Sequence, residues 1–221
     1  MEITYLGHSS FKLKTKSGLT TIIDPFSPEF VGLPYPKDVA DIVICSHGHE
    51  DHNNKSAITG PVKRSETFVI ESEGEYEIGG LEVSAMKTFH DKVEGAERGK
   101  NLVTLIRDGE LTVCHLGDLG QKLTDSQIER LGDIDVLMIP VGGEYTLTLD
   151  EVFDMIEEIS PSLVVPMHYQ VPGLKQGVDA LAPLQTFLDK NKYPLAGEPA
   201  HKLKVEESSL PDDTQVAIMN G

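Results

Sequence analysis

The first half of the chain consists mainly of short runs in which apolar residues alternate with polar ones. Alternation over about four to eight residues predicts half-buried β-strands. We expect strands at residues 2–6, 10–15, 20–24, 41–45, 67–71, 75–79, 81–88, 102–108 and 111–116. The pairs Gly79-Gly80 and Asp108-Gly109 predict hairpin turns between neighbouring strands. The run 25–36 is rich in proline and is expected to be an irregular loop.

The second half of the chain adds helix-start signals. Thr124 and Thr148 each stand three residues before a Gln or Glu, which is the spacing of a capping box, so helices should begin near 125 and 149. Apolar residues then recur on one face of the second helix, at Val152, Met155, Ile156 and Ile159. A third helix is expected within 180–191.

Two continuous apolar runs, 135–140 and 162–168, alternate with these helices. Continuous apolar runs are typical of strands covered on both faces. A strand-rich first half followed by alternating strands and helices favours an α/β (layered α+β) fold, with sheets sandwiched between helices, over a pure bundle or barrel. The 221 residues contain no linker-like segment and no repeat, so we expect one domain over residues 1–221.

Composition and charge argue against several classes of function. The chain has 36 acidic and 19 basic residues, and its formal charge of −17 argues against nucleic acid as a partner. No apolar stretch approaches the roughly 18 residues that span a bilayer, and the amino terminus lacks a leader pattern, so we expect no membrane association and a cytoplasmic location. Cys45 and Cys114 lie in apolar runs and predict buried thiols. The sequence leaves a homo-oligomer open.

Candidate chemistry collects where apolar runs end. The segment SHGHEDH follows the run 41–45 and contains His47, His49, Asp51 and His52. Other runs are followed in the same way by histidine or aspartate, namely His90, His115 with Asp118, and His168. In layered α/β folds, sites form in loops at the carboxyl ends of strands. We therefore expect these side chains to meet at one rim.

The SHGHEDH segment has a geometry suited to two cations. In an extended loop His47 and His49 project to the same side, so both can hold one cation. Asp51 can turn with its neighbour His52 toward a second cation. Imidazole and carboxylate ligands suit Zn, Fe, Mn or Ni. The alternative is a solvated histidine-rich loop, but the buried run before it and the ligands downstream favour a metal site.

The motif HxHxDH at 47–52, followed by FHD, HLGD and PMHY, resembles the metallo-β-lactamase superfamily. The opening ITYLGHSSF…IIDPF and the later PVGGEYTLTLDE are similar to the compact branch of metal-dependent hydrolases related to ascorbate-6-phosphate lactonase. The resemblance covers about residues 2–170, and HxHxDH is its specific signature. It implies a four-layer αβ/βα sandwich of two sheets flanked by helices, with metals at one edge.

The resemblance also implies a role for each matching position. The first metal ion would be held by His47, His49 and His90, the second by Asp51, His52 and His168, and both by a bridging Asp118. The implied cofactors are two divalent ions, Zn foremost, with Mn, Fe or Ni as alternatives. His90 departs from the family pattern, because it stands in Phe-His-Asp where many members have Gly-His-Thr. A surface histidine after a strand is therefore the alternative for His90.

Three residues are candidates for a direct part in the reaction. Asp51 is expected to orient a hydroxide as well as bind metal. His8 follows the first strand and either lines the site or satisfies the core. Tyr169 either donates to a leaving group or packs at the rim.

Further residues are candidates for supporting and substrate-binding roles. His115 is expected to fix the orientation of a ligand, and Asp24, which precedes a proline, to bind loop amides. The loop after His90 contains Arg98, Lys100 and Asn101. These can recognise a carboxylate or phosphate, with a mobile solvated loop as the alternative.

The functional interpretation follows from charge and from the resemblance. Two divalent cations bring four positive charges and Asp51 with Asp118 offset two, which favours a bound hydroxide and an anionic substrate. We interpret the chain as a metal-dependent hydrolase whose hydroxide attacks an ester, a lactone or a small phosphoester. A non-catalytic metal-binding or regulatory module on the same fold is the alternative. Flavodiiron redox chemistry is disfavoured, because those relatives carry glutamate where His49 stands.

Overall fold

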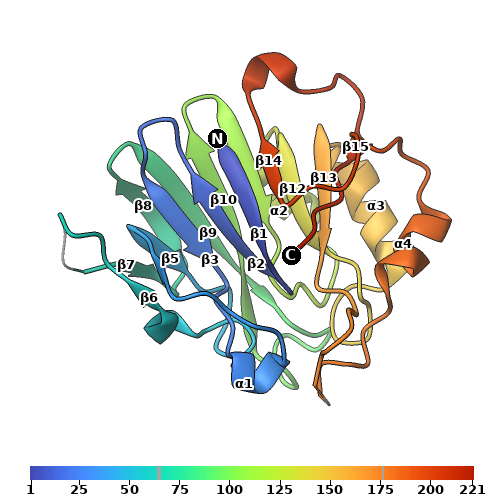
Figure 1. Cartoon of the computed structure of the whole chain (residues 1–221). Coiled ribbons are helices and arrows are strands. Elements are labelled where there is room, and N and C mark those ends of the chain that lie inside the picture. Colours follow the sequence, from blue (N-terminus) through green and yellow to red (C-terminus); the bar gives the residue numbers. More distant parts are fainter. Residues whose placement is uncertain (64–65, 176) are drawn as a thin grey trace.

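The computed structural model describes residues 1–63, 66–175 and 177–221, and its main feature is a pair of facing β-sheets (Figure 1). The first sheet has six strands in the order β14-β1-β2-β3-β5-β7. Their bounds are Glu2–Gly7 (β1), Ser10–Lys14 (β2), Thr20–Ile23 (β3), Ile42–Ile44 (β5), Phe68–Ile70 (β7) and Lys202–Lys204 (β14). Strands β3, β5 and β7 are parallel, so their carboxyl ends lie at one edge. Strand β14 pairs with β1, which joins the two ends of the chain in this sheet.

The second sheet has seven strands in the order β15-β13-β12-β11-β10-β9-β8. Their bounds are Gly74–Ile78 (β8), Leu81–Phe89 (β9), Lys100–Asp108 (β10), Leu111–His115 (β11), Val136–Pro140 (β12), Leu163–Met167 (β13) and Gln215–Val216 (β15). The pairs β8–β9, β9–β10 and β10–β11 are antiparallel, whereas the pairs β11–β12, β12–β13 and β13–β15 are parallel. A separate pair consists of β4 (Asp38–Val39) and β6 (Ile58–Thr59).

The helices follow the signals in the sequence. Their bounds are Pro28–Val31 (α1), Asp125–Leu131 (α2), Leu149–Ile159 (α3) and Leu184–Lys190 (α4), with 3-10 turns at Lys55–Ala57 (η1) and Glu207–Ser209 (η2). Both expected capping boxes are present, at Thr124 with Gln127 and at Thr148 with Glu151. The expected apolar face of α3 is buried. The expected strands are also present, with ends shifted by at most two residues.

The irregular loop expected at 25–36 contains the short helix α1, which is a correction. Ser27 caps it by accepting from the backbone N–H of Phe30, Pro28 occupies its first turn, and Gly32 ends it in a left-handed conformation. These are helix-start and helix-stop signals. The prolines alone had indicated only a loop.

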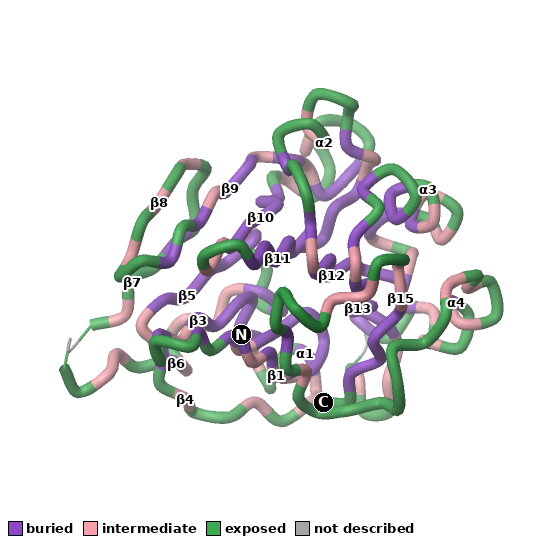
Figure 2. The backbone as a smooth tube through the Cα atoms, turned by 90° about the horizontal axis from the view of Figure 1, so that it is seen from above, coloured by how far each residue is buried: buried purple, intermediate pink, exposed green. Residues whose placement is uncertain are grey.

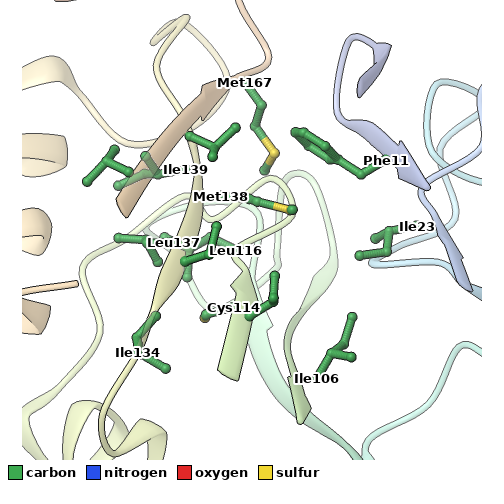
Figure 3. Close-up of a cluster of buried hydrophobic side chains, with 14 of the residues drawn as sticks. Phe11, Ile23, Ile106, Cys114, Leu116, Ile134, Leu137, Met138, Ile139 and Met167 are labelled. Atoms are coloured by element: carbon green, nitrogen blue, oxygen red, sulfur yellow. The ribbon is translucent and has the colours of Figure 1, made fainter. Parts of the chain in front are cut away.

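The core lies between the two sheets because each strand alternates its side chains. Figure 3 shows Phe11 and Ile23 of the first sheet facing Met138 and Met167 of the second. Leu137, a neighbour of Met138 along β12, projects to the other face, where α2 to α4 supply buried residues to the same cluster. Strands β11, β12 and β13 are therefore buried along their whole length, whereas the outward sides of the helices are exposed (Figure 2).

The outer face of the first sheet is covered by the segment that follows α1. Ile22 and Val43 pack there with Ala40, Cys45 and Ile58 in a smaller apolar cluster. The mixed α/β fold of two covered sheets that we expected is thereby confirmed. Within the described ranges, no helix has the length and apolar character needed to cross a membrane.

Candidate metal centre

Loops at the carboxyl ends of strands from both sheets bring a group of histidines and aspartates together. From the first sheet, β1 leads to His8, β3 to Asp24, and β5 to His47, His49, Asp51 and His52. From the second sheet, β9 leads to His90, β11 to Asp118, and β13 to His168. Three overlapping groups of these side chains have ligand atoms within 4.8 Å of one another. The convergence expected from the sequence is therefore present in the fold.

Asp118 lies at the centre of this cluster. Its Oδ2 is 3.2 Å from Nε2 of His52 and 3.2 Å from Nε2 of His90. The same oxygen is 3.3 Å from Nε2 of His168 and 4.0 Å from Nε2 of His47. Four imidazoles thus point at one buried carboxylate. His90 belongs to the cluster and is buried, so it is not the surface histidine considered as its alternative.

Two ligand groups each bring imidazole nitrogens close to Asp118. His47, His49 and His90 form one group, with ring centroids 4.6 to 5.1 Å apart. His8, Asp51, His52 and His168 form the other. His8 is buried in this second group, with its Nε2 3.3 Å from Oδ2 of Asp51. Lining the site was one of the two roles that we expected for His8, but the sequence did not place it beside Asp51.

Asp24 fixes the orientation of His52 and the start of the ligand loop. Its carboxylate accepts from Nδ1 of His52 at 2.8 Å, and from the backbone N–H and the hydroxyl of Ser46 at 2.7 and 2.6 Å. With Nδ1 bonded to Asp24, the Nε2 of His52 faces Asp51 and Asp118. A carboxylate that holds the far nitrogen of a ligating histidine selects the tautomer that leaves the near nitrogen free for metal.

Three residues of the cluster have left-handed backbone conformations that side chains rarely adopt. The φ angles are 55° at His8, 46° at Asp24 and 53° at His168. Each follows a strand, and the backbone N–H of His168 donates to the carbonyl of His8 at 2.8 Å. Such conformations cost about 1–3 kcal/mol each and persist only where surrounding contacts enforce them. Strain is therefore concentrated at this rim.

Glycines in the HLGDLG segment allow the loops to approach closely. Gly117 has φ 57°, and a Cβ at this position would overlap the Asn101 side chain and Ser46. A Cβ on Gly120 would overlap the backbone of His90 and Asp91. Asp118 can therefore reach the histidines only because the residue before it has no side chain.

Burial and charge determine the protonation of the imidazoles. Loss of hydration lowers the pKa of His47 and of His168 to about 3, so both rings are neutral at pH 7, which is the form that binds metal. Burial alone would also lower the pKa of His52, but Asp118 and Asp51 outweigh it and raise that pKa well above its usual value. Burial alone would raise the pKa of Asp118, yet His168 and His52 hold it well below its usual range.

The polar atoms at the centre of the cluster fit a metal ion. Within the described residues, Nε2 of His47, Nε2 of His52 and Oδ1 of Asp118 are buried and form no hydrogen bond. Such atoms are costly unless a ligand satisfies them. These three residues also form one of the three metal-capable groups. A donor set of imidazoles and carboxylates is that of borderline divalent cations.

The loop after His90 is held by Asp91, a residue to which the sequence assigned no role. Its Oδ1 accepts from the backbone N–H of Val93 at 2.9 Å and of Gly95 at 2.7 Å. Its Oδ2 accepts from Glu97 at 3.0 Å and from Arg98 at 2.7 Å. Burial alone would raise the pKa of Asp91, but these backbone donors lower it to about 2. The loop that carries Arg98 is thus organised around one carboxylate.

Asp91→Asn is expected to lower the melting temperature at neutral pH, because the four donors lose an ionised acceptor. The folded pKa of Asp91 lies below the unfolded value near 3.9, so its stabilisation is complete above about pH 4 and is lost as the pH falls toward 2. Thermal unfolding from pH 7 to pH 3 should therefore show the gap between wild type and variant narrowing below about pH 4. Exposed Asp213→Asn is the control, and an equal gap at every pH would contradict the prediction.

Asn101, which we expected to bind substrate, and His115, which we expected to support a ligand, both lie beneath the site. The Asn101 amide is buried; its Nδ2 donates to Thr88 and Leu116, and its Oδ1 accepts from the backbone N–H of Asp118 at 2.9 Å. Asn101 therefore supports the loop that carries Asp118, and its buried amide does not face a substrate. His115 contacts the carbonyl of Ser9 and accepts from the N–H of Gly117, so it braces two ligand loops.

Tyr169 lies away from the cluster, although it follows His168. Its hydroxyl donates to the carbonyl of Met219 at 3.3 Å, and its ring lies 6.5 Å from that of Tyr5. The packing role considered for Tyr169 matches this position, and the leaving-group role does not.

A cavity of about 420 Å³ opens over the metal-capable residues. Its lining includes Asp51, His90, Asp118 and His168, together with Arg98 and Tyr145. The Arg98 guanidinium lies 4.5 Å from the centre of the Tyr145 ring, a cation–π contact that fixes it at the rim. The sequence placed Tyr145 in a family-like segment but carried no signal for this contact.

Comparison with known proteins agrees with this geometry. Residues 2–168 match a family described as the β-lactamase superfamily domain. The chain belongs to the metallo-β-lactamase superfamily. The match ends at His168, the last of the expected ligands, so it contains the whole set.

Relatives in this superfamily extend over most of the chain. A UPF0173 metal-dependent hydrolase of Methanocaldococcus jannaschii is 31% identical over 192 residues, which cover 76% of this chain and 83% of the relative. One from Methanosphaera stadtmanae is 28% identical and covers 82% and 90% respectively.

Solved structures of the superfamily share the fold. A candidate Zn-dependent hydrolase from Thermotoga maritima superposes with a TM-score of 0.78 at 33% identity, covering 99% of this chain and 97% of that one. A metallo hydrolase from Ignicoccus hospitalis has a TM-score of 0.62 at 20% identity and covers 99% and 94%; it supports the fold alone.

Proposed function

We propose that this member of the superfamily is a metal-dependent hydrolase with a binuclear centre. The observation that supports this most is that two metal-capable groups both bring imidazole nitrogens within 4.0 Å of the buried Asp118 carboxylate. The first ion would be held by His47, His49 and His90, the second by Asp51, His52 and His168, and Asp118 would contact both. Zn is the preferred ion for this donor set, with Mn, Fe or Ni as alternatives.

When bound, divalent ions supply a nucleophile from water at neutral pH and stabilise negative charge that develops on the substrate. The residues of the chain then position and protect the reaction. Asp51 holds a proton-accepting oxygen at the cavity, within 3.3 Å of Nε2 of His8. His8 contacts this carboxylate from the buried side and can hold its orientation.

The substrate is an ester, a lactone or a small phosphoester that carries negative charge. Arg98 lines the cavity over the ligands and is exposed there, so it can donate to a carboxylate or phosphate. Asn101 acts by positioning Asp118, and Lys100 lines a neighbouring cavity rather than the one over the ligands.

The proposal is tested by metal analysis and a substrate panel. Protein purified without chelator is assayed for metal content and then for hydrolysis of lactones, thioesters and phosphodiesters. Two metal equivalents per chain and turnover that is lost with chelator and restored by metal would support the hydrolase. One tightly held equivalent with no turnover on any substrate would favour the non-catalytic module.

Arg98→Ala is expected to raise KM for an anionic substrate by about three- to tenfold, because an exposed charge-assisted contact contributes about 1 kcal/mol. Metal content and the kcat of a neutral substrate should not change. Arg130→Ala on α2 is the matched control, since Arg130 lines neither cavity near the ligands. An unchanged KM for Arg98→Ala would remove Arg98 from substrate binding.

A further inference from the structure

A second cavity lies beside the one over the ligands. Its volume is about 660 Å³, and it is lined by the loops after β5 and β7 and by the pair β9–β10. The two cavities share Gly48, His49 and Arg98. A substrate that reacts at the metal centre can therefore extend past His49 into this second space.

One wall of the second cavity carries three cations, namely Lys87, Arg98 and Lys100. In the β9–β10 register Lys87 pairs with Leu102, and Lys100 pairs with Phe89. Paired residues share a face of a sheet, and so do residues two apart along a strand. Lys87 and Lys100 therefore project from the same face as diagonal neighbours, about 7–8 Å apart at their backbones.

About half of the lysines of this acidic chain have a carboxylate partner, and Lys87 and Lys100 of this cavity belong to the other half. Among the residues that the structure describes, seven lysines form ion pairs with Asp or Glu. Across the described ranges, Lys87, Arg98 and Lys100 form none; Lys87 instead lies 5.4 Å from the centre of the Phe89 ring. Like charges that face one cavity repel each other, and an anionic ligand between them would relieve that repulsion.

Acidic residues from another segment also line this cavity, so its charge is uneven. Glu71, Ser72 and Glu73 line it from the loop after β7, and Glu71 is paired with Lys55. Their oxygens can accept from hydroxyl or ammonium groups but repel an anion. An anionic group in the cavity is therefore directed toward β9–β10.

We infer that this cavity is a subsite for a carboxylate or phosphate that the substrate carries away from its scissile bond, bound by Lys87 and Lys100. The subsite rests on the proposed function for its place in a reaction. Binding of the anion itself requires no turnover, so the two can be tested apart.

The test is an anion titration of the metal-loaded full-length protein. Glutarate and, separately, inorganic phosphate are added while backbone amide shifts are followed by NMR. Shifts are expected at 71–73 and 87–102, and the probe that binds more tightly identifies a carboxylate or a phosphate. The double variant Lys87→Gln/Lys100→Gln should weaken binding about tenfold, whereas Glu73→Gln should strengthen it.

The matched control is Lys190→Gln/Lys192→Gln, which removes the same charge from exposed ion pairs outside the cavity. The affinity of this control variant for the added anion should equal that of wild type. Equal affinity in both double variants, or shifts confined to 47–52, would mean that only the metal centre binds the anion and would overturn the subsite. The single variants Lys87→Gln and Lys100→Gln serve if the double variant does not fold.

Failure of the proposed function has a different signature. Binding that depends on Lys87 and Lys100, without hydrolysis of any substrate, would support the subsite and contradict the hydrolase. Hydrolysis with binding that is indifferent to both lysines would contradict the subsite alone.

Discussion

Asp118→Asn is expected to reduce hydrolysis by about a thousandfold and to lower metal content. Removing one preorganised electrostatic group from a reacting centre raises the barrier by about 2.7–4 kcal/mol, and each 1.36 kcal/mol is a factor of ten. Four imidazole nitrogens lie within 3.2–4.0 Å of the Asp118 carboxylate. Asn has nearly the same shape, so the loss would report charge and ligation rather than packing.

The control for this prediction is Asp154→Asn, which neutralises an exposed carboxylate paired with Lys122. It should change neither metal content nor turnover. Both variants are compared by elemental analysis and by kcat/KM on the same substrate. If Asp118→Asn kept its metal and came within threefold of wild-type turnover, Asp118 would not be a bridging ligand.

Asp24→Asn is expected to lower metal affinity about 10- to 100-fold and to destabilise the fold by about 1–3 kcal/mol. The carboxylate accepts three hydrogen bonds, from His52 and twice from Ser46. An amide in its place presents an NH₂ group to one of these donors. Asn tolerates the left-handed conformation at this position, so backbone strain does not confound the result.

Asp41→Asn separates metal affinity from stability. Asp41 also holds a strand end, accepting from the backbone N–H and the hydroxyl of Thr20, but it contacts none of the metal-capable residues. Its substitution should reduce stability while leaving metal affinity unchanged. The measurements are denaturant unfolding of metal-free protein and competition with a chromophoric chelator. Equal metal affinities of wild type and Asp24→Asn would contradict the orienting role of Asp24.

Much of the ligand set could be expected from the sequence because ligands follow strands. Each apolar run that ends in histidine or aspartate could be recognised within a few residues, and the fold places all of them at one rim. His90 was the least certain of these, since its Phe-His-Asp context is unusual. The structure explains that context, because Asp91 holds the loop that follows His90.

Roles that depend on contacts between distant segments could not be predicted in the same way. Tyr169 and Asn101 have suitable chemistry beside or within the ligand loops, yet both hydrogen-bond to internal partners. Conversely, Tyr145 lies 47 residues beyond Arg98 in the sequence, yet its ring contacts the Arg98 guanidinium at the rim. Neither outcome is visible in a single segment.

The sequence by itself determined the strands, the capping boxes of α2 and α3, and which histidines and aspartates follow strands. These features depend on periodicity and spacing within one segment, which neighbouring residues dictate locally. Only the tertiary structure decided that His8 lies beside Asp51, that Asn101 supports Asp118, and that Lys87 faces a second cavity. Those relations depend on strand register and on how two sheets pack, and both are settled by burial summed over the whole chain.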